Sequence, residues 1–469
     1  MEASLARLPE TLRGRRRTAG PIQFAVRGSR CRRRSCQPIG NGWRPRVART
    51  STLAYKETTK PVSDIGRELG ADYLLESSIR VEAGRLRITS RLVRVRDAVQ
   101  VWSESYDREP TSLLGLQQEL SAAIAAQVRV SLSPDDLARV ARRQPRSPDA
   151  YDLYLRGRNF ELQRTPATNR RAIEYYKRAT TVDPEYALAW SGLAMVHASS
   201  PINSDAPPLE VCPRAREAAM QAVRADPNLA EAQSATGLVR WMCDWDWPDA
   251  EARLRRAITL DAQLSSAHFA LGHVLSQMGR HGEALRAAER ARTLDPMSAM
   301  MHAMSSQLTF QARDYAAALD HARQAVVVDS EFWIGYMTRG QAHAQLGRIE
   351  PALEAVILAS RFSSHNSKPL ALRGYVLARA GRMREARDIL QTLTDLAQNR
   401  YVPPYAIALV SLGLGDRDGA FAWLNRAHAA RDVHLIFLTV DPKWDPIRED
   451  PRFAALLAAC GFSSGAAAL

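Results

Sequence analysis

Small and apolar positions recur along the second half of the chain with a period of 34 residues. Five alanines keep this step without a slip: Ala284, Ala318, Ala352, Ala386 and Ala420. A period of this length is typical of a solenoid in which each unit is one pair of antiparallel helices. Alanine is required where the two helices of a unit lie closest, since a larger side chain would not fit. The pattern predicts a mainly α-helical array rather than a globule with one pocket.

Two further positions of the unit are rich in small residues. The first helix has a small position at Gly272, Ser306, Gly340, Gly374 and Ala408. The turn before the second helix is rich in glycine, which adopts positive φ at little cost, at Gly279, Arg313, Gly347, Gly381 and Gly415. The five phased units begin at Ser265, Ala299, Trp333, Ser367 and Tyr401. Three less regular units precede them, which gives about eight helix pairs over residues 150–430.

The ends of the units carry a recognisable dipeptide. Asp-Pro closes units at Asp183-Pro184, Asp226-Pro227 and Asp295-Pro296. Together with the 34-residue period and the paired small positions, this resembles the tetratricopeptide repeat (TPR) family, whose pattern ends in proline at this place. The resemblance implies an α-solenoid in which the first helix of each unit lines a concave face.

The three earlier units carry insertions. Residues 199–211 are rich in proline and polar side chains, which predicts a lengthened loop. A second insertion holds Trp241, Trp245 and Trp247 near a turn between helices. The three indoles either form a ligand cage or brace a lengthened turn, and bracing is the favoured interpretation.

Residues 47–132 follow a different pattern, that of a small α/β domain. Val62, Ile65 and Leu69 share one face of a short helix ended by Gly70. Strands are predicted at 73–81, 86–92 and 99–106, joined by turns short enough for antiparallel hairpins. A longer helix follows with Leu113, Leu116, Leu120, Ile124 and Val128 on one face, and residues 133–149 form a linker with prolines.

Three segments of this domain carry a second resemblance. Ala-Arg-Thr-Ser-Thr at 48–52, Ile-Gly-Arg-Glu-Leu-Gly-Ala-Asp-Tyr-Leu-Leu-Glu-Ser-Ser-Ile-Arg at 65–80 and Val-Trp-Ser-Glu-Ser-Tyr-Asp at 101–107 are similar to the TolB-amino-terminal-like (FlgO-like) domain of bacterial regulators. In those regulators the domain precedes TPR units and follows a winged-helix, class III adenylate cyclase or protein kinase domain. The family's first strand and acidic helix have no counterpart here, because the matching residues are arginine-rich.

The chain ends in a segment, residues 431–469, expected to be a cap and tail. Residues 441–453 read Asp-Pro-Lys-Trp-Asp-Pro-Ile-Arg-Glu-Asp-Pro-Arg-Phe and precede Leu456 and Leu457, which resembles the closing segment of such regulators. Its expected role is to cover the apolar face of the last unit.

The net charge of +14 is concentrated at the amino terminus. Residues 1–49 contain 13 arginines and two glutamates, so the other residues carry only +3. A nucleic-acid partner is therefore not expected, except through residues 1–46. This stretch is either a disordered basic tail or the product of a misassigned or frame-shifted start, because out-of-frame GC-rich DNA yields this composition.

Cysteine usage and hydropathy bear on the cellular compartment. The five cysteines, an odd number without paired spacing, predict neither a disulfide framework nor a zinc ribbon, which favours a reducing compartment. No apolar run approaches the length of a membrane helix. The expected location is cytoplasmic, with the periplasmic part of a membrane-anchored regulator as the alternative.

The sequence offers binding residues but no catalytic motif. No nucleophile elbow, phosphate loop, zinc-protease motif or calcium loop is present, so we expect no enzyme activity, no cofactor and no metal site. In the concave face, the ninth and thirteenth residues of the units form a ladder of polar side chains with two aromatic ones. The candidate groove is His273, Gln277, Gln307, Phe310, Gln311, Gln341, Gln345, Tyr375 and Arg379.

These features predict a non-enzymatic scaffold that binds a peptide or protein in its groove. It would be the sensory or regulatory part of a bacterial signalling or transcription-regulatory protein. The alternative is the C-terminal regulatory portion of an adenylate cyclase or protein kinase whose catalytic domain is not in this chain.

Overall fold

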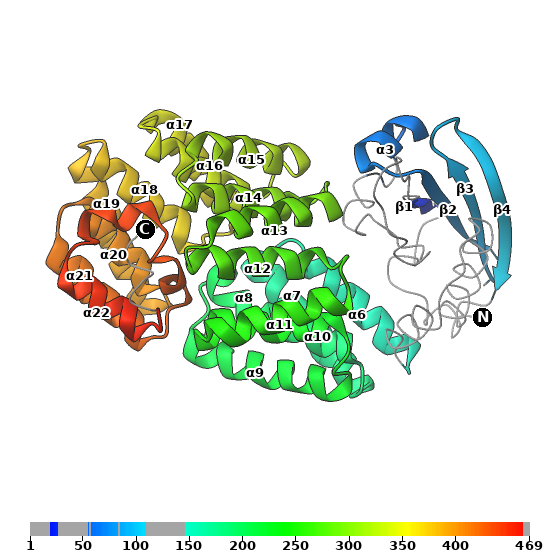
Figure 1. The fold of residues 1–469 in the computed structure, drawn as a ribbon, viewed down its shortest axis with the longest axis horizontal. Helices are drawn as coiled ribbons and strands as arrows, with labels where there is room; N and C mark the ends of the chain where they lie inside the picture. Colours follow the sequence, from blue (N-terminus) through cyan, green and yellow to red (C-terminus); the bar gives the residue numbers. More distant parts are fainter. Residues whose placement is uncertain (1–18, 27–54, 56–57, 83–84, 109–145, 463–469) are drawn as a thin grey trace, which may run out of the picture. The chain divides into compact units, whose positions relative to one another are not determined.

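The structure is a computed structural model that describes residues 19–26, 55, 58–82, 85–108 and 146–462 (Figure 1). The chain divides into two compact units. One comprises Met1–Asp152 with Thr293–Met297, and the other comprises Leu153–Arg292 with Ser298–Leu469.

The first unit contains an antiparallel sheet in which the strands follow chain order. They are β1 (Ala19–Val26), β2 (Tyr73–Glu82), β3 (Arg85–Arg94) and β4 (Val99–Arg108). Helix α3 (Val62–Leu69) ends where Gly70 takes a φ of 56°. The predicted short helix and three strands are therefore present. The predicted helix through Leu113–Val128 lies outside the described residues.

Strand β1 departs from the interpretation of residues 1–46 as a lead without structure. It pairs with β2, with Phe24 opposite Leu75. Ile22, Phe24 and Val26 alternate with Gln23 and Ala25, which is the period of a strand. The surrounding arginines dominate the composition and hide this short alternation.

The core of this unit is small. Ile65 and Leu69 of α3 pack with Leu74 of β2, and Ile65 and Leu74 are fully buried. The hydroxyls of Ser77 and Ser90 lie 2.7 Å apart between the paired strands β2 and β3, so these two buried polar groups satisfy one another.

The second unit is a solenoid of paired helices, as the periodicity predicts. Eight pairs follow one another within residues 148–429, of which the first helix begins in the last residues of the first unit. The pairs are α6 (Pro148–Glu161) and α7 (Pro166–Val182), α8 (Ala187–Ser204) and α9 (Pro208–Ala225), α10 (Ala230–Val239) and α11 (Trp247–Leu260), α12 (Ser265–Gln277) and α13 (His281–Leu294), α14 (Ala299–Gln311) and α15 (Tyr315–Val328), α16 (Trp333–Gln345) and α17 (Ile349–Phe362), α18 (Ser367–Arg379) and α19 (Met383–Asn399), and α20 (Pro404–Gly413) and α21 (Arg417–Ala429).

The phased units start where the sequence places them, with one exception. Helices α12, α14, α16 and α18 begin at the predicted residues. Helix α20 begins at Pro404, three residues after Tyr401, because Pro403 and Pro404 fit a helix start and not its interior.

The small residues lie where the helices of a unit approach most closely. A Cβ atom on Gly340 would lie 2.6 Å from Cγ2 of Val356 and 3.3 Å from the carbonyl oxygen of Ala352. In the preceding unit, Ser306 occupies the same place and its hydroxyl donates to the Ala318 carbonyl at 2.7 Å. All five phased alanines are at most 1% exposed.

The turn position has positive φ in every phased unit. The values are 79° at Gly279, 69° at Arg313, 70° at Gly347, 76° at Gly381 and 84° at Gly415. Arg313 is the one residue of this set with a side chain, and its guanidinium pairs with the Asp445 carboxylate at 2.5 Å.

The irregular units depart from the prediction at the first insertion. The expected loop at 199–211 is mostly helical, because α8 runs to Ser204 and α9 begins at Pro208. Pro201 lies inside α8, and the Ser200 hydroxyl donates to the Val196 carbonyl at 2.6 Å. Side-chain hydrogen bonds to the preceding turn thus accompany the proline within the helix.

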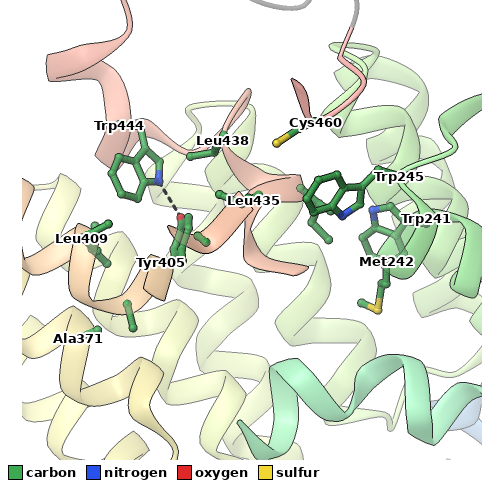
Figure 2. Packing of buried hydrophobic residues seen from close by; sticks show 14 of the residues in the cluster. Trp241, Met242, Trp245, Ala371, Tyr405, Leu409, Leu435, Leu438, Trp444 and Cys460 are labelled. Atoms are coloured by element: carbon green, nitrogen blue, oxygen red, sulfur yellow. Dashed lines mark hydrogen bonds between the residues drawn. The ribbon is translucent and has the colours of Figure 1, made fainter. Parts of the chain in front are cut away.

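The carboxyl-terminal segment consists of short helices: η4 (Val433–Phe437), η5 (Pro442–Ile447) and α22 (Pro451–Ala459). Helix α22 packs against α21, with Phe453 fully buried. Trp444 lies beside Tyr405 of α20 and donates to its hydroxyl at 2.7 Å (Figure 2). The segment is therefore integral to the core of the array.

Candidate functional site

The main cavity of the second unit has a volume of about 160 Å³. Helices α8, α12, α14, α16, α18 and α20, which are first helices of their units, supply most of its wall. The π-helix η3 (Arg240–Asp244), the loop residue Arg164 and the carboxyl-terminal segment supply the rest. None of the lining residues comes from a second helix, so the cavity lies on the inner face of the solenoid.

The structure separates the two positions of the polar ladder. His273, Gln307 and Gln341, the ninth residues of their units, line the cavity. The amide of Gln341 donates to Gln307 at 2.6 Å, so these two side chains are joined.

The thirteenth residues lie apart from the cavity lining. Gln277 is fully buried and accepts from Trp241 at 2.6 Å, and Gln311 accepts from the Ser276 hydroxyl at 2.8 Å. Gln345 is half-buried, and Arg379 is exposed with its guanidinium 3.4 Å from the Tyr375 hydroxyl. Tyr375 and Phe310 are buried. Three ninth residues, His273, Gln307 and Gln341, are therefore brought together at the cavity, whereas Tyr375, also a ninth residue, is not among the lining residues.

The cavity wall is largely apolar and rich in sulfur and aromatic rings. Four methionines contribute to it, together with indole and phenyl rings from four elements: Met242, Met300, Met304, Met337, Trp241, Trp333, Phe269 and Phe437. Methionine side chains adapt to differently shaped ligands, and aromatic faces provide large contact areas.

One wall belongs to the carboxyl-terminal segment. The Lys443 ammonium pairs with Asp441 at 2.7 Å and lies 5.0 Å from the centre of the Phe310 ring. The Tyr405 hydroxyl lies 3.3 Å from the same aspartate. Burial and the Asp441 carboxylate raise the pKa of Tyr405 well above its usual value. The Lys443 charge is thus neutralised within the protein.

Lys368 is a second lysine in the cavity lining. Its ammonium lies 4.9 Å from the centre of the Trp333 ring, and burial lowers its pKa to about 8.

His273 is 1% exposed, stacks on Trp241 with ring centres 5.3 Å apart, and has a pKa lowered to about 3 by burial. Its imidazole is therefore neutral near pH 7.

Contacts between distant units hold the cavity walls together. Asp205, after α8, accepts from the backbone amide of Ser367 at 2.8 Å and from its hydroxyl at 3.0 Å. The Asn366 amide donates to the Ile202 carbonyl at 3.0 Å, and the Thr439 hydroxyl donates to the Gln277 carbonyl at 3.0 Å. The irregular units, the phased units and the carboxyl-terminal segment thus enclose the same space.

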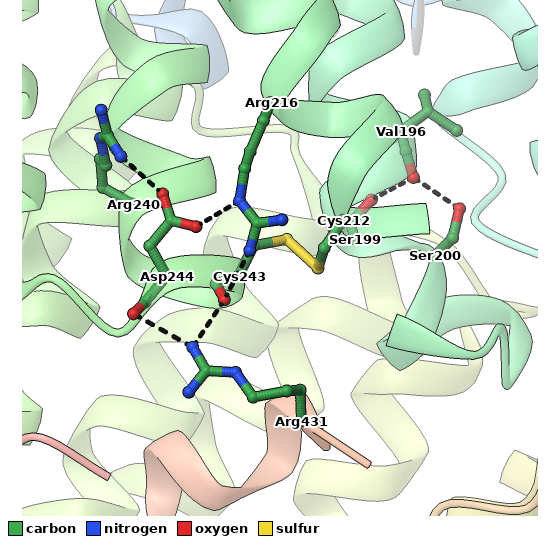
Figure 3. Close-up of a disulfide and its surroundings, with 9 residues drawn as sticks. All are labelled: Val196, Ser199, Ser200, Cys212, Arg216, Arg240, Cys243, Asp244 and Arg431. Carbon is green, nitrogen blue, oxygen red and sulfur yellow. Dashed lines mark hydrogen bonds and ion pairs between the residues drawn. A yellow bond between two sulfur atoms is a disulfide. The ribbon is translucent and has the colours of Figure 1, made fainter. Parts of the chain in front are cut away.

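A disulfide joins Cys212 of α9 to Cys243 of η3, with Cα atoms 5.6 Å apart (Figure 3). The expectation that the cysteines form no disulfide is therefore wrong. The two residues are 31 positions apart, and only the fold of the second insertion brings them together. Cys460 is a buried free thiol.

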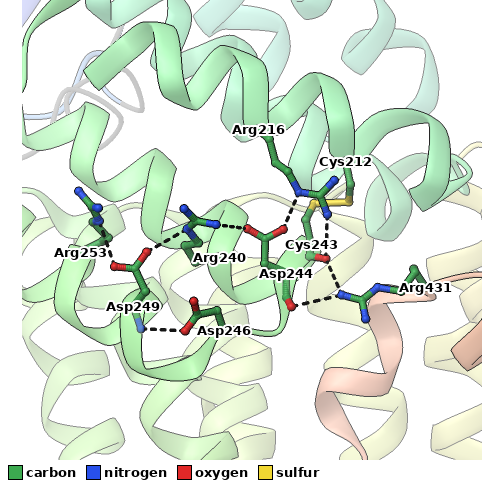
Figure 4. A network of polar contacts seen from close by, with 9 residues as sticks. All are labelled: Cys212, Arg216, Arg240, Cys243, Asp244, Asp246, Asp249, Arg253 and Arg431. Atoms are coloured by element: carbon green, nitrogen blue, oxygen red, sulfur yellow. Dashed lines mark hydrogen bonds and ion pairs between the residues drawn. A yellow bond between two sulfur atoms is a disulfide. The ribbon is translucent and has the colours of Figure 1, made fainter. Parts of the chain in front are cut away.

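An ion-pair network surrounds the disulfide (Figure 4). The Asp244 carboxylate accepts from Arg216 at 2.6 Å and from Arg240 at 2.8 Å. Arg431, before η4, donates to the carbonyl of Cys243 at 3.1 Å and to that of Asp244 at 3.2 Å, and stacks its guanidinium on Trp245. The network fixes the second insertion to the carboxyl-terminal segment.

The three indoles of this insertion do not form a cage. Trp241, Trp245 and Trp247 are each at most 6% exposed. Trp247 stacks on Phe462 with ring centres 4.6 Å apart, and only Trp241 lines the cavity. The indoles brace the turn, as the favoured interpretation has it.

Within the described residues, no group of three or more histidine, cysteine, aspartate or glutamate side chains is placed to hold a metal ion. No helix among them is long and apolar enough to cross a membrane.

Comparison with known proteins identifies the repeats. The tetratricopeptide-repeat family model TPR_16 matches residues 269–326 and 303–367. A relative named "Putative adenylate cyclase 3", from Rhizobium meliloti (strain 1021), is 33% identical over 157 residues, which are 34% of this chain and 27% of the relative. The chain thus spans about a quarter of that relative's length.

Solved structures also resemble parts of the chain. The Cut9–Hcn1 hetero-tetramer of the APC/C gives a TM-score of 0.45 at 16% identity, covering 66% of this chain and 55% of that one. Yeast Tom70 gives 0.41 at 16% identity, covering 67% and 68%. Because these scores are low, the assignment of the repeats rests on the family match and on the geometry of the helix pairs.

Proposed function

We propose that this chain, which carries tetratricopeptide repeats, is a non-enzymatic protein-interaction scaffold and the sensory or regulatory part of a bacterial signalling protein. The observation that carries the proposal is the inner cavity, where His273, Gln307 and Gln341 lie among methionine and aromatic side chains. A peptide segment placed along this face inserts an apolar side chain into the cavity and exchanges hydrogen bonds with the two amides.

Photo-crosslinking within cells of the source organism tests this scaffold. A benzophenone amino acid at Met304 places the reactive group at the cavity, whereas the same residue at Val327, which is 75% exposed on α15, places it on the outer face. We expect a discrete partner adduct from position 304 that position 327 does not give. Identical adducts from both positions, or no adduct from position 304, would contradict the proposal that the partner binds to the inner face.

A second candidate function follows from the curated relative. The stretch similar to "Putative adenylate cyclase 3" favours a regulatory portion of a cyclase-like protein. Sequencing the gene with its upstream region, translated in all three frames, tests this. A cyclase, kinase or winged-helix domain in an uninterrupted frame would support it, and stop codons in every frame would refute it.

We further propose a periplasmic location. The sequence favours the cytoplasm with the periplasm as the alternative, and the Cys212–Cys243 bond supports the alternative, because disulfides persist in oxidising compartments. Alkylation of free thiols in intact cells tests this. Among the described cysteines, we expect Cys460 to be labelled after unfolding without reductant and Cys212 and Cys243 to stay unlabelled. Labelling of Cys212 and Cys243 without reductant would contradict the periplasmic location.

A further inference from the structure

The cavity has a surplus of positive charge. Its lining includes three basic side chains, Arg164, Lys368 and Lys443, and one acidic side chain, Asp441. Lys443 is paired with Asp441. The Glu161 carboxylate, which is not a lining residue, acts on the charge of Arg164. The charge of Lys368 is therefore left without a counter-charge in the lining.

Lys368 forms no ion pair with any residue that the structure describes. The carboxylates that act on Lys368 through their charge, Asp205 and Asp432, are both engaged elsewhere. Asp205 accepts two hydrogen bonds from Ser367. Asp432 accepts from the Tyr405 amide at 3.1 Å and from the His434 ring at 2.7 Å.

Trp333 lies beside Lys368 in the cavity wall. Its indole N–H donates to the Arg164 carbonyl at 3.2 Å, and its ring lies under the Lys368 ammonium. A buried cation without a carboxylate partner is costly, since its hydration is lost without compensation. An anion that entered the cavity beside Trp333 would supply the missing partner.

A second group in the lining also lacks a partner. Both ring nitrogens of His273 are buried and make no hydrogen bond within the described structure. Buried polar atoms are nearly always hydrogen-bonded in native proteins, so an unpaired imidazole at a cavity points to a ligand atom.

The remaining wall and the volume define the body of the ligand. Trp241, Trp333, Phe269 and Phe437 present ring surfaces, with methionines between them. An apolar engineered cavity of about 150 Å³ accommodates one benzene ring, and this cavity has about 160 Å³.

We propose that the inner cavity is a binding site for a small aromatic carboxylic acid. Its carboxylate pairs with Lys368, and its ring lies between the indole, phenyl and methionine side chains. Such a site serves the sensing of a metabolite and exists whether or not a protein partner docks on the array.

Titration calorimetry with phenylacetate on the full chain tests the site, with phenylacetamide as the uncharged probe of nearly the same shape. We expect phenylacetate to bind and phenylacetamide to bind about tenfold or more weakly, because a charge-assisted hydrogen bond is lost. Lys368→Met should weaken phenylacetate binding by about tenfold or more and leave the phenylacetamide affinity unchanged.

One variant serves as a control. Lys177→Met removes an exposed lysine of α7 and should leave binding unchanged. Lys368→Met removes an unpaired cation and should fold normally, which circular dichroism checks.

Three results would overturn the proposal. These are no binding of phenylacetate or of the larger indole-3-acetate at millimolar concentration, equal affinity for the acid and the amide, or an unchanged affinity in folded Lys368→Met. None of these three results changes what crosslinking at Met304 shows. The proposal of a small-molecule site and the proposal of a protein-interaction scaffold are therefore tested independently.

Discussion

The phased units and the irregular units build the same solenoid with different means. From α12 to α21, small residues at fixed places set the spacing of the helices, and the turns take positive φ at the same position each time. From α8 to α11, the chain also has small residues at close helix contacts, such as Gly237 against Leu254, and adds a π-helix, a disulfide and buried indoles. The repeated small residues therefore determine how the helices of the solenoid pack. The irregular units differ from the phased units by the π-helix, the disulfide and the buried indoles.

The largest expected effect concerns packing within a phased unit. Ala352→Trp places an indole where the residue is fully buried against α16, so overpacking should lower the free energy of unfolding by about 3 kcal/mol or more. Ile357→Trp, on the same helix at a half-exposed position, should change it by less than about 0.5 kcal/mol. Urea unfolding of both variants measures the difference, and equal effects would show that the phase is wrong.

The irregular units should depend on their covalent link. Replacing Cys212 and Cys243 with serine together should lower the free energy of unfolding by about 2–4 kcal/mol, because the link closes a loop of 31 residues in the unfolded chain. Reductant should destabilise the native protein by a similar amount and leave the double variant unaffected. A native protein insensitive to reductant would contradict a stabilising disulfide.

The buried imidazole of His273 should make stability depend on pH. Its pKa is about 3 in the folded protein and near 6.5 when unfolded, so the unfolded chain binds the proton first. Stability is therefore lost as the pH falls below about 6.5, by up to about 1.4 kcal/mol for each pH unit. His273→Phe keeps a stacking ring, and its unfolding free energy, measured between pH 7 and 4, should fall less steeply than that of the native chain. Parallel profiles would contradict the buried neutral state.

The smallest expected effects test the turns. Gly347→Ala adds a methyl group that has no atom within 4 Å. The variant should therefore lower the free energy of unfolding by about 1 kcal/mol, because alanine is strained at positive φ. Arg313→Gly removes the same strain, and in an Asp445→Asn background, where the ion pair is already lost, it should stabilise the protein by about 1 kcal/mol. Chemical denaturation measures both. Destabilisation by Arg313→Gly in that background would show that the turn is unstrained.

Local signals in the sequence were sufficient for most of the fold. The 34-residue step predicts the starts of α12, α14, α16 and α18, and the strands predicted at 73–81, 86–92 and 99–106 correspond to β2, β3 and β4, with alternation as the signal for β3. Strand β1 was missed because its alternation spans few residues among many arginines. The helical extension of α8 past Pro201 was missed because proline normally ends a helix.

The candidate site was only partly accessible from the sequence. His273, Gln307 and Gln341 follow from the repeat phase, because the ninth residue of a first helix faces inward. Lys368, Arg164 and the residues of η4 and η5 do not follow from it. They reach the cavity through contacts between segments far apart in the chain, such as Trp333 with Arg164, which no periodic pattern encodes.

The most direct test of the inner cavity as a ligand site is a crystal structure of the protein with 4-bromophenylacetate, in which anomalous scattering locates the bromine. The account predicts one bromine peak inside the cavity among the methionine and aromatic side chains, with the carboxylate at the Lys368 ammonium. Bromine peaks only on the outer surface, with the cavity empty of ligand, would contradict it.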